Sequence, residues 1–271
     1  MKIFKNKDQL RREIGNKKSI SFVPTMGGLH KGHISLIKTA KKYTNETLVS
    51  IYVNPKQFNK KEDFKKYPRN LVKDLKILKK LKVNYLYLPT YKDLFKFKPF
   101  HRVYLHKFAT TLCGKYRKGH FKGVLDVVNR FLEIVRPKYL FLGLKDFQQL
   151  ILIHKHILKN KIVTKITSCK TVREPSGVAC SSRNFNLNKN QMKIAKDVFN
   201  YLIKIKKKTK KNLKLFDSTL FKKDLIKIGV NKIDYLEIIN RKTLQKPKRS
   251  SENFNVFIAY YLNKVRLIDN I

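Results

Sequence analysis

The residues with the clearest chemical potential lie in one short stretch, from Phe22 to His33, with the sequence Phe-Val-Pro-Thr-Met-Gly-Gly-Leu-His-Lys-Gly-His. Its glycines allow a tight turn and a close approach of the backbone to a ligand. His30 and His33 are three residues apart and can share one face of a helix that begins here. Because amides at a helix N-terminus favour an anion, the stretch predicts a nucleotide-binding turn.

The two histidines could also serve a different purpose. A pair of histidines can be structural or can bind a metal, although no third ligand is spaced near them. The chain has neither a Gly-rich loop ending in Lys-Ser or Lys-Thr nor the three spaced glycines of a dinucleotide fingerprint. If the chain binds phosphate, it would therefore use another arrangement, such as histidine, lysine, serine and arginine side chains placed at strand ends.

Polar residues follow two other apolar runs. Asn54 and Gln57 come directly after the apolar segment 48–53, and the segment 143–149 follows the apolar segment 139–142. Continuous apolar runs of this length are typical of parallel strands buried on both faces. Open α/β sheets bind their ligands at the carboxyl ends of such strands, so these polar residues are candidates for a site.

Each of these candidates can also be purely structural. Asn54-Pro55 can be a simple turn. Asp146 and Gln149 are three residues apart and can form a capping box at the start of a helix, which needs no substrate. Ser181, Ser182 and Arg183 suit phosphate oxygens, but they also suit a serine turn or cap with a surface arginine.

The elements that must position these residues alternate along the chain. Strand-like runs and helical stripes repeat often enough to predict an α/β fold, a Rossmann-like doubly wound parallel sheet. We expect this domain to span residues 1–169 and a smaller α+β domain to span residues 170–271. The expected strands and helices include helix 7–14, a strand that Pro24 stops, strand 48–53, helix 71–81, strand 85–88, helix 124–135, strand 139–142, strand 162–169, a helix opened by a capping box at Asn188 and Gln191, helix 220–228 and strands 233–239, 256–262 and 265–268, the last two joined by a hairpin at Asn263-Lys264.

Two segments resist a clear assignment. The pattern weakens between Tyr91 and Leu112, which predicts an irregular insertion with a strand at Arg102 to Leu105. Gly114 to Gly123 looks like a basic, glycine-bounded loop that either covers a phosphate or merely connects two elements.

The charge of the chain is its most unusual property. Its 63 lysines and arginines against 18 aspartates and glutamates give a formal net charge of +45, which invites a nucleic-acid function. The lysines are spread along the whole chain, however, and the many Asn, Ile, Phe and Tyr residues fit a bias toward A/T-rich codons. We therefore expect incidental, salt-sensitive binding of polyanions and no specific nucleic-acid partner.

The remaining composition predicts a globular, cytoplasmic protein. No apolar run is long enough to span a bilayer, so no membrane partner is expected, and the N-terminus lacks a signal-peptide pattern. Cys113, Cys169 and Cys180 show neither a pairing nor a metal-binding spacing, which fits a reducing compartment.

Together, the motifs resemble the pantothenate synthetase family, also called pantoate–beta-alanine ligases, which belongs to the wider nucleotidyltransferase superfamily marked by His-x-Gly-His. They occur in the order and at the approximate spacing of that family and cover nearly the whole chain. The matching blocks are Pro24–His33, Ser50–Phe58, Tyr67–Arg69, Gly119–Gly123, Gly143–Gln149 and Arg173–Asn184, with Arg266–Asn270 near the end.

The resemblance implies an ATP-dependent ligation in two steps. The carboxylate of pantoate attacks the α-phosphorus of ATP, which releases pyrophosphate and leaves pantoyl adenylate. The amine of β-alanine then attacks the acyl carbon, which gives pantothenate and AMP. The resemblance also implies a homodimer and Mg²⁺ bridging the ATP phosphates.

The resemblance assigns roles to particular residues. His30 and His33 would contact the phosphates, with His33 as proton donor, and Lys145 would neutralise charge on the transferring phosphorus. Gln57 and Gln149 would bind pantoate with Asn54 beside them, and Asp74 would contribute to the Mg²⁺ shell. The implied ATP-binding residues are Met26, Gly27, Gly28, Leu29, His30, Lys31, Gly32, His33, Gly143, Leu144, Lys145, Asp146, Val172, Cys180, Ser181, Ser182 and Arg183.

Some positions depart from the family pattern, among them Tyr52, Lys122, Leu144 and Cys180, but none removes a group with an assigned role. Two other functions stay open. One is an RNA-binding protein on the same scaffold, motivated by the charge, and the other is an adenylyltransferase for a phosphorylated vitamin, whose product would be an adenylate in place of AMP.

Overall fold

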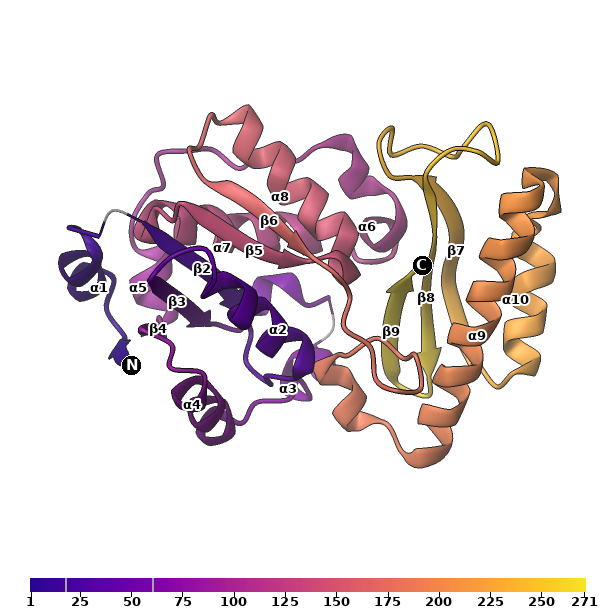
Figure 1. Ribbon diagram of the computed structural model, residues 1–271, viewed down its shortest axis with the longest axis horizontal. Coiled ribbons are helices and arrows are strands. Elements are labelled where there is room, and N and C mark those ends of the chain that lie inside the picture. Colours follow the sequence, from indigo (N-terminus) through magenta and orange to yellow (C-terminus); the bar gives the residue numbers. More distant parts are fainter. Residues whose placement is uncertain (18, 60) are drawn as a thin grey trace. The chain divides into compact units, whose positions relative to one another are not determined.

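The computed structural model describes residues 1–17, 19–59 and 61–271, with the side chain of Lys61 excepted (Figure 1). The chain forms two compact units, Met1–Val172 and Arg173–Ile271. Each unit has its own sheet, and each is described separately below.

The first unit is built on a six-stranded sheet with the order β1-β4-β3-β2-β5-β6. All of its pairings are parallel. From β2 the chain continues to β3 and β4 on one side and later to β5 and β6 on the other, so the switch point of the topology lies between β2 and β5. The strands are β1 (Lys2–Phe4), β2 (Ile20–Thr25), β3 (Glu46–Ile51), β4 (Tyr85–Tyr87), β5 (Tyr139–Gly143) and β6 (Lys165–Cys169).

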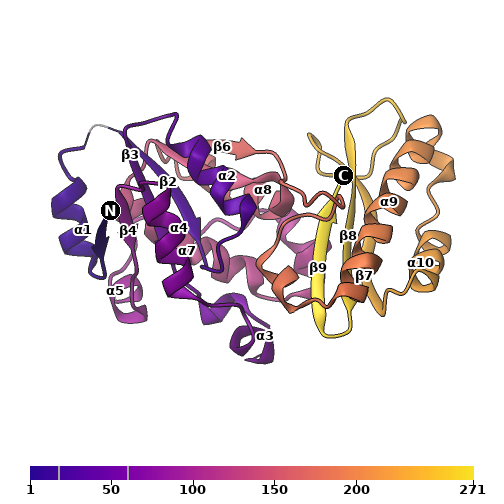
Figure 2. The same ribbon diagram turned by 60° about the horizontal axis from the view of Figure 1, so that its bottom comes forward.

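Helices connect these strands and lie on both sides of the sheet (Figures 1 and 2). Asparagines begin some of them, as where the Asn6 side chain accepts hydrogen bonds from two amides at the start of α1. The helices of this unit are α1 (Lys7–Ile14), α2 (Lys31–Ala40), α3 (Lys61–Lys65), α4 (Leu71–Lys80), α5 (Tyr91–Phe95), α6 (Leu112–Tyr116), α7 (His120–Val135) and α8 (Phe147–Lys159), with 3₁₀ turns η1 (Pro55–Gln57), η2 (Lys107–Thr110) and η3 (Leu144–Asp146).

Side chains that alternate along the strands pack against different helices on the two faces. Val23 and Val49 belong to a buried cluster that includes Ile37 of α2. Phe22, the neighbour of Val23, packs on the opposite face against Phe131 of α7, with ring centroids 5.6 Å apart. The predicted α/β fold with a parallel sheet covered on both faces is therefore confirmed.

Pro24 does not end its strand, contrary to the prediction. It lies within β2, and the pairing of β2 with β3 continues through Pro24 to Thr25 and Ile51. The pairing of β2 with β5, by contrast, ends at Phe22 and Leu140. A proline has no N–H to donate to a ladder, so Pro24 limits the pairing on one side only.

Two other expectations were wrong in part. Arg102 to Leu105 form no strand, and the expected insertion contains α5 and η2. The expected loop from Gly114 to Gly123 is short, because α6 extends to Tyr116 and α7 begins at His120. The sequence predicted this helix only from Val124, because the apolar periodicity is interrupted by polar residues in the first turn of α7.

The second unit is a three-stranded antiparallel sheet, β7-β8-β9, against which α9 and α10 pack (Figure 2). The predicted capping box is present, because Asn188 and Gln191 exchange side-chain and backbone hydrogen bonds at the start of α9. The predicted hairpin turn at Asn263-Lys264 is also present. The elements are η4 (Ser182–Asn186), α9 (Lys189–Lys211), η5 (Leu213–Leu215), α10 (Ser218–Lys227), β7 (Lys232–Asn240), β8 (Phe254–Leu262) and β9 (Val265–Asn270).

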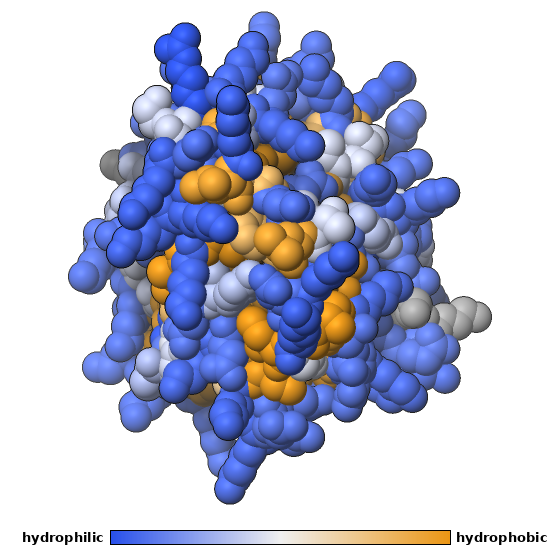
Figure 3. All heavy atoms as spheres, turned by 90° about the vertical axis from the view of Figure 1, so that its right-hand side faces the viewer, coloured by the Kyte–Doolittle hydropathy of each residue, from blue (hydrophilic) through white to orange (hydrophobic). Residues whose placement is uncertain are grey.

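Hydrophilic side chains cover most of the face shown in Figure 3, and hydrophobic areas interrupt them near its centre. Within the described residues, no helix has both the length and the apolar character that crossing a membrane requires. The cysteines Cys113, Cys169 and Cys180 form no disulfide among the described residues, and all three are buried.

Candidate active site

The glycine turn, residues 26–29, leaves the carboxyl end of β2 with two backbone conformations that favour glycine, a φ of 76° at Gly27 and 61° at Gly28. The carboxylate of Asp74 in α4 binds this turn through two hydrogen bonds. Its Oδ2 accepts a hydrogen bond from the Gly28 amide at 2.9 Å, and its Oδ1 accepts one from the Leu29 amide at 2.8 Å. A Cβ at Gly27 would lie only 3.0 Å from the same carboxylate, so the turn and Asp74 fit closely.

His30 and His33 lie side by side at the start of α2, with ring centroids 4.1 Å apart. The Nδ1 of His30 accepts a hydrogen bond from the Gly32 amide at 3.1 Å. The Nδ1 of His33 accepts one from the His30 amide at 3.4 Å. A neutral imidazole that accepts at Nδ1 carries its proton at Nε2, so both rings have Nε2–H as a donor for a ligand.

The electrostatics keep His33 uncharged. Burial lowers the pKa of His33 well below its ordinary 6.5, and the neighbouring His30 ring and the Lys145 ammonium further disfavour a positive charge on it. Lys145 lies in η3, directly after β5, on the other side of the switch point from β3. Its ammonium is 3.7 Å from Asp146 Oδ1, and its side chain is only 18% exposed.

A second turn covers residues 54–57 and follows β3. We call it the acid turn, because the family resemblance implies that it binds the acid substrate. Asn54 is fully buried; its Oδ1 accepts from the Lys56 amide at 3.2 Å, and its Nδ2 donates to the Gly123 carbonyl at 3.0 Å. The buried Gln57 donates a side-chain hydrogen bond to Met26 Sδ in the glycine turn. The acid turn and the glycine turn are thus in contact.

The segment after β5 contributes Gly143 to Asp146 and the start of α8. Asp146 makes no side-chain cap hydrogen bond to α8, so the alternative of a capping box with Gln149 is wrong. Gln149 is half-buried in the first turn of α8. Its neighbour Gln148 is buried and is bonded to the backbone of Cys113, Phe108 and Thr111, which gives it a structural role.

The remaining predicted residues lie at the end of the first unit and in the second. Val172 closes the first unit, and Cys180 to Arg183 belong to the second. There the Ser181 hydroxyl accepts a hydrogen bond from the Arg183 amide at 3.2 Å, as a cap of η4. The thiol of Cys180 donates to Glu174 Oε1 at 3.2 Å.

Residues that could hold a metal are sparse. The described residues contain no group of three or more His, Cys, Asp or Glu side chains suited to a metal ion. Asp74 is only 2% exposed, and both of its oxygens accept backbone hydrogen bonds. This arrangement does not favour Asp74 as a direct ligand of Mg²⁺, which needs an oxygen facing the phosphates.

Two residues were missed as parts of this region. Arg117 and His120 both contact the backbone carbonyl of Gln57. In the sequence they are separated from Gln57 by 60 and 63 positions. The sequence set their loop apart by its basic character and by the family block Gly119–Gly123, but neither signal pairs these residues with the acid turn.

A glycine turn followed by two histidines that accept backbone hydrogen bonds at Nδ1, beside the switch point of a parallel sheet, defines a nucleotide-binding α/β enzyme. Comparison with known proteins narrows this class. The family model for pantoate-beta-alanine ligase matches residues 2–271. The chain is 38% identical over 273 residues to the pantothenate synthetase of Flavobacterium psychrophilum, covering 98% of this chain and 95% of that protein. It is 37% identical to the pantothenate synthetase of Thermosipho africanus, covering 100% and 98%.

Solved structures are also similar. The pantoate-beta-alanine ligase of Francisella tularensis, complexed with beta-gamma ATP and beta-alanine, has a TM-score of 0.84 at 37% identity, covering 100% of this chain and 97% of that one. The pantothenate synthetase of Thermus thermophilus has a TM-score of 0.90 at 28% identity, covering 100% and 99%. The chain therefore belongs to the pantoate-beta-alanine ligase family. Its activity is the ligation that forms pantothenate from pantoate, beta-alanine and ATP.

Proposed function

We propose that the ligation proceeds through pantoyl adenylate. The oxygen of the pantoate carboxylate forms a bond to the α-phosphorus of ATP while the bond to pyrophosphate breaks. The amine of β-alanine then attacks the acyl carbon and loses a proton, and AMP leaves. A mixed anhydride has a good leaving group, whereas a free carboxylate does not react with an amine.

The observation that carries this proposal is the pair of histidines with Nε2–H donors at the start of α2. Since the pKa of His33 is lowered, His33 is neutral at neutral pH. It would therefore stabilise the departing pyrophosphate by donating a hydrogen bond, without transferring its proton. Lys145 would neutralise charge that gathers on the phosphorus, and this kind of electrostatic stabilisation is usually the largest contribution to such a step.

The binding roles in this proposal are those that the family resemblance gives to these residues. Gln57 and Gln149 would hold pantoate, with Asn54 fixing the acid turn. Residues 26–33 and 143–146 would surround the nucleotide, with Val172 near adenine. Cys180, Ser181, Ser182 and Arg183 would bind the outer phosphates, because hydroxyls and a guanidinium suit phosphate oxygens.

Other parts of the proposal rest on the family alone. Mg²⁺ would bridge the ATP phosphates, and the second unit would act as a lid over the nucleotide. The lid would comprise residues 170–271 and the nucleotide domain residues 1–169. A homodimer and a cytoplasmic location also belong to this proposal.

An isotope experiment tests the adenylate. Pantoate labelled with ¹⁸O in both carboxylate oxygens is incubated with the protein, ATP, Mg²⁺ and β-alanine. The adenylate route transfers one labelled oxygen from each pantoate to AMP. Unlabelled AMP, release of ADP, or AMP formation that does not need pantoate would contradict the proposal.

A further inference from the structure

Residues 117–123 comprise the end of the loop before α7 and the first turn of that helix. They have no role in the proposal above, but they make several contacts with the acid turn. We propose that Arg117, His120 and Gly123 are positioning residues for the acid substrate, because they fix the backbone that carries Gln57. This inference rests on the proposed role of Gln57 in binding pantoate.

Two side chains converge on one carbonyl. The Nδ1 of His120 donates to the Gln57 carbonyl at 2.7 Å, and the Nη2 of Arg117 donates to the same oxygen at 3.1 Å. The Nη1 of Arg117 also donates to the Nε2 of His120 at 2.9 Å. A neutral imidazole that accepts at Nε2 must carry its proton at Nδ1, so Arg117 selects the tautomer that can hold Gln57.

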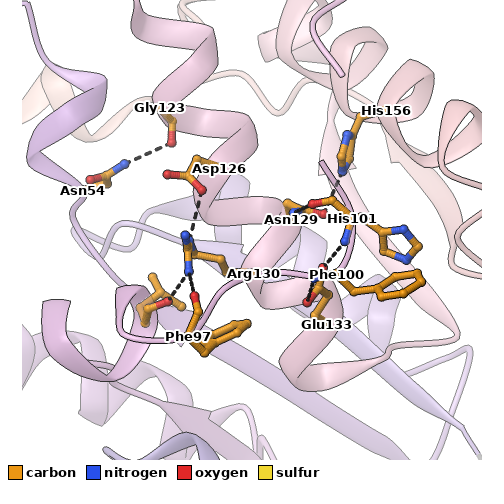
Figure 4. Close-up of polar contacts among 11 residues, drawn as sticks. Asn54, Phe97, Phe100, His101, Gly123, Asp126, Asn129, Arg130, Glu133 and His156 are labelled. Atoms are coloured by element: carbon orange, nitrogen blue, oxygen red, sulfur yellow. Dashed lines mark hydrogen bonds and ion pairs between the residues drawn. The ribbon is translucent and has the colours of Figure 1, made fainter. Parts of the chain in front are cut away.

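Backbone contacts hold the same turn from the side. A Cβ at Gly123 would lie 2.7 Å from the carbonyl oxygen of Lys56, closer than real Cβ contacts allow. The Gly123 carbonyl accepts the hydrogen bond from the buried Asn54, and Figure 4 shows this side chain directed at the first turns of α7. Gly123 therefore lets the helix and the acid turn approach closely.

The helix that carries these groups is itself firmly held. Further along α7, Arg130 is bonded to Asp126 at 3.0 Å and to the carbonyls of Leu94 and Phe97 at 3.2 and 2.6 Å (Figure 4). Most residues of α7 are buried. The start of α7 is thus a rigid support, and a rigid support can fix the geometry of a binding side chain.

The contacts predict a specific defect. They involve only the acid turn, whereas the glycine turn is held by Asp74. Losing the His120 contact should therefore raise the KM for pantoate by about 5- to 20-fold, the effect of one buried hydrogen bond to a carbonyl. The affinity for ATP, measured without pantoate by titration calorimetry, should change less than about twofold.

The test compares His120→Ala with His120→Asn, whose amide nitrogen can occupy the position of Nδ1 and restore the donor. Arg117→Lys removes the planar guanidinium that donates to both His120 and the Gln57 carbonyl. Gly123→Ala introduces a Cβ that would clash with the Lys56 carbonyl. Lys118→Ala, an exposed neighbour, controls for the loss of positive charge. Each variant is measured for its KM values for pantoate, ATP and β-alanine, its kcat and its melting temperature, with the unaltered protein assayed in parallel.

The inference is supported if His120→Ala, Arg117→Lys and Gly123→Ala raise the KM for pantoate selectively while His120→Asn and Lys118→Ala remain near the unaltered protein. Equal changes in the KM values for pantoate and ATP, or a lower melting temperature alone, would show general support of the fold and overturn it. A change confined to the KM for β-alanine would indicate direct contact with that substrate and also overturn it. If Gly123→Ala does not fold, the two His120 variants decide. Failure of the unaltered protein to consume pantoate would instead refute the proposed function.

Discussion

The glycine turn and the acid turn follow neighbouring parallel strands, yet they are held by groups of opposite polarity. The amides of Gly28 and Leu29 are bound by the carboxylate of Asp74. The carbonyl of Gln57 is bound instead by Arg117 and His120. The amides of the glycine turn are therefore fixed by an acceptor, whereas the Gln57 carbonyl of the acid turn is fixed by donors.

This difference follows from the backbone conformation of each turn. Gly27 and Gly28, with their positive φ values, form a turn whose buried amides need hydrogen-bond acceptors. The two oxygens of the Asp74 carboxylate supply these acceptors. The acid turn is a single 3₁₀ turn, which leaves carbonyls at its end that need donors. Both supports come from later crossover segments, α4 for the glycine turn and the start of α7 for the acid turn. The two turns can therefore be disturbed separately.

Lys145→Ala should have the largest effect, because Lys145 is proposed to neutralise charge in the reaction step whose substrates the two turns would hold. Removing this charge should lower kcat for pantoate-dependent AMP release by about 100- to 1,000-fold, while the melting temperature stays nearly constant. Lys42→Ala removes an exposed lysine and should change kcat little. Equal losses in both variants would mean that overall charge matters and Lys145 does not.

Asp74→Asn should damage the glycine turn alone. Asparagine keeps the size of the side chain but replaces one acceptor by an amide NH₂ that faces a backbone N–H. Losing a buried, charge-assisted hydrogen bond should lower kcat/KM for ATP by about 10- to 100-fold. The KM for pantoate should change less.

Two controls sharpen this prediction. Asp8→Asn alters an exposed carboxylate and should have no effect on either substrate. If Asp74 acts on the turn, excess Mg²⁺ should not rescue Asp74→Asn, and binding of ATP in EDTA should be weakened as well. Rescue by Mg²⁺ would favour the metal role that the family resemblance implied.

Asn54→Ala is the matching change in the acid turn. It removes the bonds to the Lys56 amide and the Gly123 carbonyl. Steady-state kinetics should show a rise in the KM for pantoate of about 5- to 10-fold with little change for ATP. Asn59→Ala breaks a comparable bond, to the Lys118 carbonyl, at an exposed position, and should leave both KM values unchanged.

The smallest effect concerns pH. His33 is neutral in the folded protein, but the unfolded chain binds a proton at His33 below about pH 6.5, so the unfolded state binds more protons there. Stability should consequently fall as the pH drops from 7 to 5. His156, whose pKa burial lowers to about 4, contributes a loss of the same sign.

His33→Asn tests this linkage, because it removes one of the two groups. Thermal unfolding followed by circular dichroism should show that its melting temperature falls less between pH 7 and pH 5, by about 2–4 °C, the shift that about 1 kcal/mol produces in a domain of this size. The same pH dependence in both proteins would show that His33 is protonated in the folded state.

The local parts of the fold were predictable from the sequence. Helix 7–14 was placed at its observed bounds, and the capping box of Asn188 and Gln191 was predicted from spacing alone. The same spacing left a capping box open at Asp146, and the structure excludes it. Asp146 ends a 3₁₀ turn with φ −96° and ψ 50°, whereas a cap requires an extended conformation. Spacing shows that a cap is possible but not which backbone conformation precedes the helix.

The site was predictable only in part, for a similar reason. His30 and His33 were identified as a pair because their contact spans one helical turn. The bond from Gly28 to Asp74 spans 46 positions, so nothing near Asp74 in the sequence reveals that it holds the glycine turn. The family resemblance pointed to Asp74, but as a contributor to the Mg²⁺ shell. Matching motifs identify a residue but do not show which atoms its side chain contacts.

Pro24 has one more consequence. The ladder between β2 and β3 has six residue pairs, but the ladder between β2 and β5 has two. Beyond Phe22 and Leu140, the strand that leads to His30 and the strand that leads to Lys145 are therefore joined by no ladder pair in the described sheet. No ladder pair of the described sheet fixes their separation at this end. The missing N–H of Pro24 thus leaves the ends of these two strands unpaired with each other within a continuous sheet.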